Sequence, residues 1–585
     1  MRDKPSSRIK QVRGQRRRGA VIVLAATMMI VMMAMLALSV DVGYMYTMQT
    51  QLQRSVDAAA LAGAGQLVEG QDAATGKVVE YLVRNPVGRQ VFVCDDDNIE
   101  LLVTQFLQEH QEDLEVHLGH WNYQTRTMEI SDLLPSTISV RMAYPNERLF
   151  FGPVIGTDTF DIVAESIAMY QPRDIMLVLD LSASMNDDSE FKSIGRFGRE
   201  AVEAGLEQMW VELGSPQYGD MQVAPQYAVI LGDEPSNGSL PQIGIEYRYT
   251  EIKVTSTKPI DKVIVQYSNG RRYAYNNISG NTATISGSGY ASGKAIYYVW
   301  VKSGANDPDG NGYGEFFDLD SGSIKYRIRD ALGLANVPYP YNSGDWTDYI
   351  DYCRDSDNQN ADAGYRYRFG YLNLMNYWLD SKPSNYQTED LWKVSAQPCK
   401  AVKNAVHVFM EYIQEVDTND RVGLAIYNYS GDGDGHLECP LTSDFDAITD
   451  LSDHRQAGHY HSYTNIGGGM TVARQELEQN GRTGAFKMIV LMTDGLPNWV
   501  NGGYNQSGAT NYVLDEADLA ADRRYPIFTI SLGANADTAL MQEVADRTDT
   551  THFNVPGGAT MDDYDDDLKE AFREIADERP LKIVK

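Results

Sequence analysis

The stretch Ile175-Met-Leu-Val-Leu-Asp180-Leu-Ser-Ala-Ser184 predicts how the chain folds. Its five apolar residues are typical of a short, fully buried strand, which ends on the carboxylate of Asp180. Ser182 and Ser184 follow at alternate positions, so a tight loop brings their hydroxyls and that carboxylate to one place. Oxygen ligands of this hardness suit Mg²⁺, which binds few protein groups and keeps several waters.

Two later stretches complement the first. Lys487–Met492 is a second apolar run, and it ends in Thr493-Asp494-Gly495. Between the two runs, Tyr463–Gly469 carries the hydroxyl of Thr464 in a glycine-rich loop ahead of a helical pattern. In an open α/β sheet, ligands bind beyond the carboxyl ends of the strands. We therefore expect Asp180 and Asp494 to meet at that edge.

In this order, the three parts resemble a von Willebrand factor A domain with a metal-ion-dependent adhesion site, whose pattern is D-x-S-x-S, then a threonine, then an aspartate. The resemblance implies that Asp180 anchors the site and that Ser182 and Ser184 bind Mg²⁺ (or Mn²⁺) directly. It implies that Thr464 and Asp494 bind the ion directly or through water, and that a protein partner presents a carboxylate to the open position. The alternative is a turn of small polar residues that binds no metal.

The composition limits the partners. The chain has 585 residues, with 50 Lys and Arg against 81 Asp and Glu, which gives a formal net charge of −31. This acidity argues against nucleic acid, and against anionic lipid, as partners of the main body. The four cysteines form no C-x-x-C pair, so one or two disulfides and buried free thiols remain the alternatives. They are Cys94, Cys353, Cys399 and Cys439.

An uncharged run from Ala20 to Val40 predicts a membrane anchor. At about 1.5 Å per residue a helix of this length spans about 32 Å, enough to cross a hydrocarbon core of about 30 Å. The basic residues before it place the N-terminus in the cytoplasm. We expect a single pass through the cytoplasmic (inner) membrane, with the body from about Asp41 periplasmic or extracellular. A cleaved signal peptide is the alternative.

The N-terminal region also resembles TadE/TadG-like proteins of the tight-adherence (Flp) pilus assembly machinery. The resemblance rests on Arg18–Leu24, on Val40-Asp-Val-Gly43 and on Gln51–Gly63 with its Asp-Ala-Ala-Ala-Leu-Ala block. It implies a role in pilus assembly or surface adhesion. A prepilin peptidase site would need a glutamate five residues after Gly19, where the chain has Leu24. The missing glutamate argues against a structural minor pilin or pseudopilin, which is the alternative function.

A large interruption separates the serine loop from the rest of the A domain. Short Tyr-, Val-, Ile- and Thr-rich segments between about 220 and 305 predict a β-sandwich-like module, with a hairpin turn at Asn269-Gly270. The expected strands are Ile245–Val254, Lys262–Tyr267, Arg271–Tyr275, Ala283–Ile285 and Ala295–Val301. The aromatic-rich segment 335–395 indicates either an apolar core or a carbohydrate- or peptide-binding surface.

A second metal site is predicted from the spacing of oxygen side chains in the acidic loop that follows the β-rich module. The spacing is that of an EF-hand-like Ca²⁺ loop, with Gly312 at its sixth position. The candidate ligands are Asp307, Asp309, Asn311, Tyr313, Glu315 and Asp318. Position 12 is Asp rather than Glu and no clear helix precedes the loop, so an acidic loop without an ion is the alternative.

An enzyme is the competing functional class. Ser182 and Asp180 with His459 or His461 would make a metal-dependent or serine hydrolase. However, no G-x-S-x-G elbow surrounds Ser182, a metal-bound serine is not a free nucleophile, and no P-loop is present. We therefore expect a binding protein without catalytic residues, in which the two histidines line the rim of the metal site.

From Gln397 onward, helical and strand patterns alternate, which predicts parallel crossovers and a doubly wound sheet. The predicted fold class is α/β: a Rossmann-like A domain interrupted by a β-rich insertion and preceded by a transmembrane helix and a small α+β segment, in which Glu100–Gln111 is helix or strand. The expected parts are a basic cytoplasmic tail (1–18), a transmembrane helix (19–42), a TadG-like amphipathic helix (43–68), an α+β membrane-proximal segment (69–171), the A domain (172–190 and 396–585) and the insertion (191–395).

Overall fold

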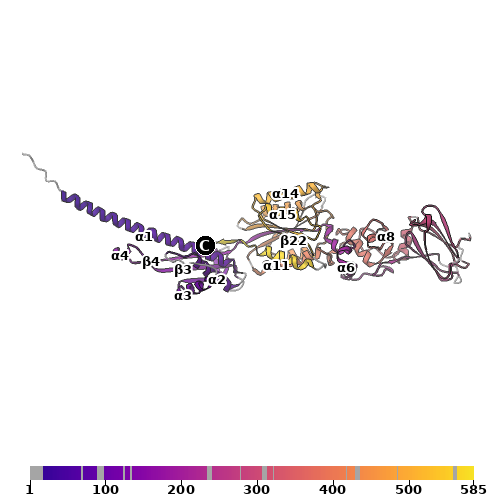
Figure 1. The fold of residues 1–585 in the computed structure, drawn as a ribbon, viewed down its shortest axis with the longest axis horizontal. Helices are drawn as coiled ribbons and strands as arrows, with labels where there is room; N and C mark the ends of the chain where they lie inside the picture. Colours follow the sequence, from indigo (N-terminus) through magenta and orange to yellow (C-terminus); the bar gives the residue numbers. More distant parts are fainter. Residues whose placement is uncertain are drawn as a thin grey trace, which may run out of the picture. The chain divides into compact units, whose positions relative to one another are not determined.

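The computed structural model describes residues 18–67, 70–88, 98–122, 125–131, 135–233, 240–276, 278–305, 312–320, 322–416, 418–428, 435–483, 485–557 and 563–585. The chain forms two compact units (Figure 1). The first comprises Met1–Gln171, Glu415–Thr418 and Arg579–Lys585, and the second Pro172–Gln414 and Asn419–Glu578. The chain therefore enters the second unit after Gln171, returns briefly to the first at Glu415–Thr418, and leaves the second unit for the last time after Glu578.

The first unit packs helices on an antiparallel sheet. Its helices are α1 (Arg18–Ala64), α2 (Gln71–Arg84), α3 (Ile99–Glu109) and α4 (Gly152–Ile155). Its sheet has the order β2 (Thr127–Ile130), β1 (Leu114–Asn122), β3 (Thr137–Arg148), β4 (Thr159–Tyr170) and β23 (Leu581–Ile583). β23 comes from beyond the second unit and pairs with β4, with Leu581 opposite Tyr170. The second unit is thus inserted between two neighbouring strands of one sheet.

The predicted transmembrane and amphipathic helices form one continuous helix, α1. No proline interrupts residues 18–64, so the helical hydrogen bonds continue through the polar step at Asp41. The part from Val21 to Val40 is apolar and exposed, whereas Met48, Leu52 and residues beyond them are buried against the first unit. Within the described ranges, α1 is the one helix long and apolar enough to cross a membrane.

A six-stranded sheet forms the centre of the second unit and confirms the α/β prediction. Its order is β17 (His436–Thr442), β16 (Arg421–Tyr427), β5 (Arg173–Asp180), β18 (Phe486–Thr493), β21 (Ile527–Leu532) and β22 (His552–Val555). All neighbours are parallel except β17, which runs antiparallel to β16. The helices that follow are α11 (Cys399–Val416), α12 (Phe445–Asp453), α13 (Ile466–Gln479), α14 (Gln506–Asp522), α15 (Thr538–Arg547) and α16 (Asp563–Asp577).

Helices cover both faces of this sheet. One apolar core joins the sheet to α11 and α16, and the other joins it to α13, α14 and α15. Alternate residues of β5 point into opposite cores: Leu177 into the first and Val178 into the second. The central strand is therefore buried on both faces, as its continuous apolar sequence predicts.

The β-rich insertion lies between β5 and α11. One four-stranded sheet has the order β11 (Arg272–Asn276), β10 (Lys262–Tyr267), β13 (Ile296–Lys302) and β14 (Glu315–Asp318). The other has the order β12 (Thr282–Ser286), β9 (Glu251–Ser256), β8 (Ile243–Tyr247) and β7 (Val229–Leu231). The two sheets share one apolar core. The predicted hairpin turn is present, since the N–H of Gly270 donates to the carbonyl of Tyr267.

Helices complete the insertion around an aromatic core. They are α5 (Ile194–Phe197), α6 (Arg199–Glu212), α7 (Ile324–Ala331), α8 (Trp346–Arg354), α9 (Gln359–Asp362) and α10 (Tyr371–Ser381), with the short strand pair β6 (Gln226–Tyr227) and β15 (Arg368–Phe369). Tyr349, Tyr371 and Trp378 are almost completely buried. The aromatic residues of segment 335–395 thus contribute mainly to a core. Cys353, Cys399 and Cys439 are buried free thiols, and Cys94 lies outside the described residues.

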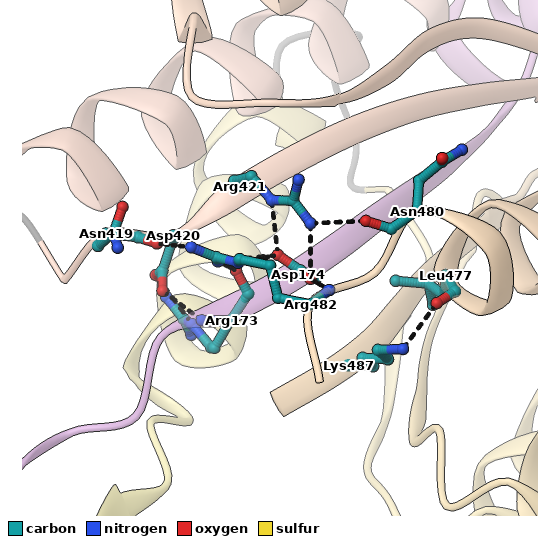
Figure 2. Close-up of polar contacts among 9 residues, drawn as sticks. All are labelled: Arg173, Asp174, Asn419, Asp420, Arg421, Leu477, Asn480, Arg482 and Lys487. Carbon is teal, nitrogen blue, oxygen red and sulfur yellow. Dashed lines mark hydrogen bonds and ion pairs between the residues drawn. The ribbon is translucent and has the colours of Figure 1, made fainter. Parts of the chain in front are cut away.

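The amino end of β5 carries a network of ion pairs (Figure 2). Arg173 and Asp420 bind each other at 2.8 Å, and both side chains are fully buried. Asp174 binds Arg421 and Arg482 on either side. Burial disfavours the charged form of Asp174, but its hydrogen bonds and ion pairs with the two arginines hold its pKa below the usual value. This end of the strand is therefore structural, and the opposite end is free for the predicted site.

Candidate metal centre

Asp180 ends β5 and is fully buried. Its Oδ1 accepts a hydrogen bond from the backbone N–H of Ser182 at 2.8 Å, which forms the tight turn expected of this stretch. Its Oδ2 accepts hydrogen bonds from the hydroxyls of Thr493 (2.9 Å) and Tyr427 (3.1 Å). Two neighbouring strands, β18 and β16, thus hold the carboxylate in place. Sequence reasoning did not assign these two hydroxyls.

The two serine hydroxyls connect Asp180's loop to Asp494. Ser182 Oγ lies 2.8 Å from Ser184 Oγ, and Ser184 Oγ donates to Asp494 Oδ1 at 2.8 Å. The backbone N–H of Asp494 also points to Asp180 Oδ2, at 3.4 Å. Four of the five predicted ligands therefore form one connected group at the carboxyl edge of the sheet.

Thr464 joins this group through the backbone of its loop. The carbonyl of Ser462 accepts a hydrogen bond from the N–H of Ala183 at 3.3 Å, so the loop lies against the serine turn. Thr464 itself is buried, and its N–H donates to Asn498 Oδ1 at 2.9 Å. Asn498 follows the Thr493-Asp494-Gly495 stretch, so one loop positions both Thr464 and Asp494.

The electrostatics of the site favour a cation. Burial raises the pKa of Asp180 and, more strongly, that of Asp494, and the negative charge of Asp180 adds to the second shift. Two buried carboxylates in one hydrogen-bonded group repel each other when both are ionised. A divalent cation beside them would remove that repulsion.

The residues present fit a small, hard ion. The donors are carboxylate and hydroxyl oxygens, which Mg²⁺ and Mn²⁺ prefer. A cavity of about 20 Å³ is bounded by Ser184 and Asp494, and about 10–15 Å³ suffices for one water. In the described part of the chain no group of three or more His, Cys, Asp or Glu side chains is placed to hold a metal. An ion bound here would therefore depend on the serine hydroxyls as well as the carboxylates.

The segment after the serine turn, up to the start of the insertion, contributes to the wall of this cavity. Asp188 and Arg196, just after the serine turn, line it together with Tyr564 of α16. Arg196 binds Asp188 at 3.1 Å, and its Nη2 donates to the carbonyl of Pro556 at 3.0 Å. Sequence reasoning missed Arg196 because the residues that it contacts beyond the insertion lie more than three hundred positions later.

A stack of aromatic rings lies beside the Thr464 loop. The rings of His461 and Tyr463 are 5.1 Å apart, and those of Tyr463 and Trp499 are 4.4 Å apart. Trp499 and the exposed Tyr504 come from the short hairpin of β19 (Trp499–Val500) and β20 (Gly503–Tyr504). The Asn501-Gly502 turn directly after the aspartate motif is the sequence signal that would have located this hairpin.

His459, the other predicted rim residue, is half-buried, and its carbonyl accepts a hydrogen bond from the N–H of Asn385 in the insertion at 3.0 Å. It thus ties the insertion to the loop before Thr464. The structure does not place it in the hydrogen-bonded group of the four ligands.

The predicted Ca²⁺ loop is only partly described. Asp307, Asp309 and Asn311 lie outside the described residues, and Tyr313, Glu315 and Asp318 lie within them. Glu315 begins β14, and its Oε1 accepts a hydrogen bond from the N–H of Asp233 at 2.8 Å. Asp318 ends the same strand. The Ca²⁺ interpretation stays a prediction, and two of its residues belong to a sheet.

Comparison with solved structures finds distant likenesses, each over about a third of this chain. An aerotolerance-related membrane protein from Bacteroides fragilis is 15% identical, with 31% of this chain and 90% of that chain covered and a TM-score of 0.24. The pilus adhesin SpaC from Lactobacillus rhamnosus GG is 19% identical, with 32% of this chain and 28% of that chain covered and a TM-score of 0.25. A von Willebrand factor type A protein from Catenulispora acidiphila is 14% identical, with 31% of this chain and 38% of that chain covered and a TM-score of 0.23. Likenesses at this level carry no argument about function.

Two sequence families match the chain itself. Residues 392–567 match the von Willebrand factor type A domain. Residues 19–66 match the putative Flp pilus-assembly TadE/G-like family. A search of curated proteins gives no match. The matched segments contain α1 from Gly19 to Ala64 and, after the insertion, the strands and helices from α11 to β22, whereas the central strand β5 lies outside them. The chain therefore carries a von Willebrand factor type A domain and a TadE/G-like N-terminal segment.

Proposed function

We propose that this chain is a membrane-anchored, extracytoplasmic protein that binds a protein partner through a divalent metal ion, in Tad/Flp-type pilus assembly or surface adhesion. The five proposed ligands are Asp180, Ser182, Ser184, Thr464 and Asp494. The observation that carries the proposal is the continuous hydrogen-bonded connection from Asp180 through both serines to Asp494. It assembles hard oxygen donors at the edge of the sheet where α/β folds bind ligands.

Each part of this chain has a defined role in the proposal. The Mg²⁺ or Mn²⁺ ion, when bound, supplies the positive charge that attracts a carboxylate of the partner. Thr493 and Tyr427 keep Asp180 oriented. Tyr463, Trp499 and Tyr504 offer an aromatic rim of the kind enriched at protein interfaces. The proposed activity is binding rather than catalysis.

The membrane topology is part of the proposal. The exposed apolar stretch of α1 is long enough to span the bilayer. The basic residues before Gly19 favour a cytoplasmic N-terminus, which leaves the type A domain on the far side of the inner membrane. The acidic body fits a protein partner better than a nucleic acid.

The test is calorimetric titration of Mg²⁺ and of Mn²⁺ into the full-length protein in nanodiscs, compared with the Ser184→Ala variant. Ser193→Ala is the matched control, because its hydroxyl lies in the segment after the serine turn but donates to the carbonyls of Asp188 and Glu190. We expect Ser184→Ala to weaken binding about tenfold or more and Ser193→Ala to leave it unchanged. A folded wild-type protein that binds neither ion would contradict the proposal and leave the type A domain as a scaffold.

A cell-based comparison separates the two cellular roles. In cells that carry Asp180→Ala, loss of surface pili would support assembly, and normal pili with lost attachment would support adhesion. Cells with normal pili and normal attachment would contradict both roles.

A further inference from the structure

The connection between β3 and β4 ends in an exposed apolar tip, here called the β3–β4 tip and defined as residues 149–155. Phe150 is 51% exposed, Phe151 42% and Val154 84%, the largest exposed fraction among the described large apolar residues. Loops that face water are usually polar. Several large apolar side chains on one short loop mark a surface that something apolar covers.

Hydrogen bonds fix this tip to α1 at the end of its apolar stretch. The backbone N–H groups of Phe150 and Phe151 donate to Asp41 Oδ1 at 2.9 and 3.2 Å, and that of Phe151 also to Oδ2 at 3.1 Å. The ring of Tyr44 packs edge-on against Phe150, with centroids 4.9 Å apart. Asp41 is only 4% exposed. The one acidic residue at this end of the span is therefore satisfied by the tip.

A groove continues from this junction along the membrane-spanning part of α1. Its volume is about 660 Å³, and Phe151 and Val154 line it together with α1 residues between Ile30 and Asp41. At about 1.5 Å per residue, Ile30 lies about 16 Å from Asp41 along the helix axis. α4, which carries Val154, lies alongside α1 in Figure 1. The apolar tip is thus level with helix residues that are themselves exposed and apolar.

We propose that the β3–β4 tip inserts into the bilayer beside α1 and that lipid acyl chains fill the groove between them. The inference rests on the membrane anchoring in the proposed function. Lipid is the expected occupant because the α1 residues that form the groove wall belong to the same apolar helix surface that lipid would cover elsewhere along the span. Tyr44 and the exposed Tyr46 lie one turn beyond Asp41, where aromatic side chains commonly mark the membrane–water interface.

The consequence is a second membrane contact for the first unit. A single helix is free to rotate about its axis and to tilt. With an apolar loop fixed beside the helix, the first unit presents one defined face of its sheet to the membrane. The competing occupant is an apolar helix from another protein or from a second copy of this chain.

The experiment places a photo-reactive benzoylphenylalanine at position 154 of the full-length protein in native membranes. The same probe at position 33, within the span of α1, is the positive control. At position 130 it is the matched negative control, because Ile130 is also apolar and 68% exposed but lies on β2, the far edge of the sheet. Since Val154 is so exposed, the substitution disturbs no packing. After illumination, mass spectrometry identifies what each position has bound.

We expect lipid adducts at position 154 at a yield similar to position 33 and about tenfold above position 130. Lipid adducts at 33 with position 154 no higher than 130 would overturn the inference while leaving the anchor intact. Adducts at 154 to a protein chain would also overturn it and identify a helix as the occupant. Absence of lipid adducts at position 33 would overturn both the inference and the membrane anchoring on which it rests.

Discussion

Arg173 joins the first and last residues of the second unit. Its guanidinium binds Asp420 and also donates to the carbonyls of Ala576 (2.9 Å) and Glu578 (3.2 Å). Arg173 follows the first residue of the second unit, and Glu578 is the last residue before the chain leaves it. One fully buried side chain therefore holds the two ends of the second unit together.

Substitution of Asp420 by Asn should be costly. It leaves the buried guanidinium of Arg173 without its counter-charge, and breaking a buried ion pair in this way typically lowers the free energy of unfolding by about 3–5 kcal/mol. Asp518→Asn is the control, because Asp518 pairs with Arg547 at 2.8 Å with 61% of its side chain exposed, and exposed pairs contribute about 1 kcal/mol or less. Urea denaturation measures both. Equal effects of the two substitutions would contradict this account.

His459 should make the second unit sensitive to mild acid. Burial, followed by the charges of Arg455, Lys403 and His436 and opposed by Glu438, lowers the pKa of His459 to about 4. An unfolded histidine titrates near pH 6.5, so the unfolded state binds more protons between these values. The stabilisation is complete above about pH 6.5 and is lost as the pH falls through about 4, by about 3 kcal/mol in all at 1.36 kcal/mol per pH unit.

The measurement is the free energy of unfolding as a function of pH for the wild type and for His459→Gln. Between pH 6.5 and 4, the free energy of unfolding of the variant should depend less steeply on pH, by up to about 1.36 kcal/mol per pH unit, the contribution of one proton. Identical slopes in the two proteins would show that His459 titrates normally in the folded state.

At the scale of single residues, the sequence was informative where ligands are close together and uninformative where distant loops meet. The spacing of Asp180, Ser182 and Ser184 was enough to predict their common turn. The hydroxyls of Thr493 and Tyr427, which hold Asp180, lie on strands whose neighbours depend on the order of the whole sheet. A pattern search along the chain has no means of detecting such contacts.

At the scale of elements, the close approach of α13 to the sheet depends on glycine. Asn465 caps the helix by accepting a hydrogen bond from the N–H of Gly468 at 3.2 Å. A Cβ on Gly469 would lie 2.8 Å from Tyr427 Cδ1 and 2.9 Å from Val178 Cγ1. The first turn of α13 therefore packs directly on β5 and β16, below the hydroxyl that holds Asp180.

Gly469→Ala should therefore destabilise the type A domain by about 1–3 kcal/mol, the usual cost of overpacking. It should also weaken Mg²⁺ binding, because a shift of the Tyr427 ring moves its hydroxyl away from Asp180. The control is Gly76→Ala within α2, where a Cβ meets nothing within 4 Å and where alanine is about 0.5–1 kcal/mol more favourable than glycine. Thermal unfolding and calorimetry measure the two effects. If Gly469→Ala stabilises the protein as Gly76→Ala does, the inferred close packing of α13 on the sheet is wrong.

Element types were more predictable than element ends. The β-rich module and the alternating helices and strands follow from apolar periodicity, and both are present. The expected strand Ile245–Val254 is two strands, β8 and β9, joined by a turn in which Tyr249 has φ of 69°. The turn contains no glycine or proline, and tyrosine rarely adopts this backbone conformation, so no residue in the sequence predicts a turn here. The segments predicted as a transmembrane helix (19–42) and an amphipathic helix (43–68) share the single helix α1, in which Asp41 finds its partners in the β3–β4 tip.

At the scale of the whole molecule, β23 completes the sheet of the first unit from beyond the second. The N–H of Val584 donates to the carbonyl of Ile167 at 2.8 Å, and the N–H of Ile167 donates to the carbonyl of Lys585 at 2.9 Å. Val584→Pro removes the first donor and should lower the stability of the first unit by about 1–3 kcal/mol. Val584→Ala, which keeps the N–H, is the control.

Amide hydrogen exchange distinguishes the two units in this experiment. With Val584→Pro, exchange should become faster at Ile167 and Met169 on β4, while the amides of β5 keep their wild-type rates. A uniform increase over both units would mean that they unfold together and that the effect of β23 is not local.

The return of the chain to β4 also sets the order of events during biosynthesis. Until residues 581–583 have been synthesised, the outer edge of β4 lacks its β23 partner. An open strand edge of this kind is a template for mispairing with another chain. The sheet of the first unit is therefore completed only after the type A domain and its insertion have been synthesised. A molecule cut short within either of them would leave that edge available to chaperones and proteases.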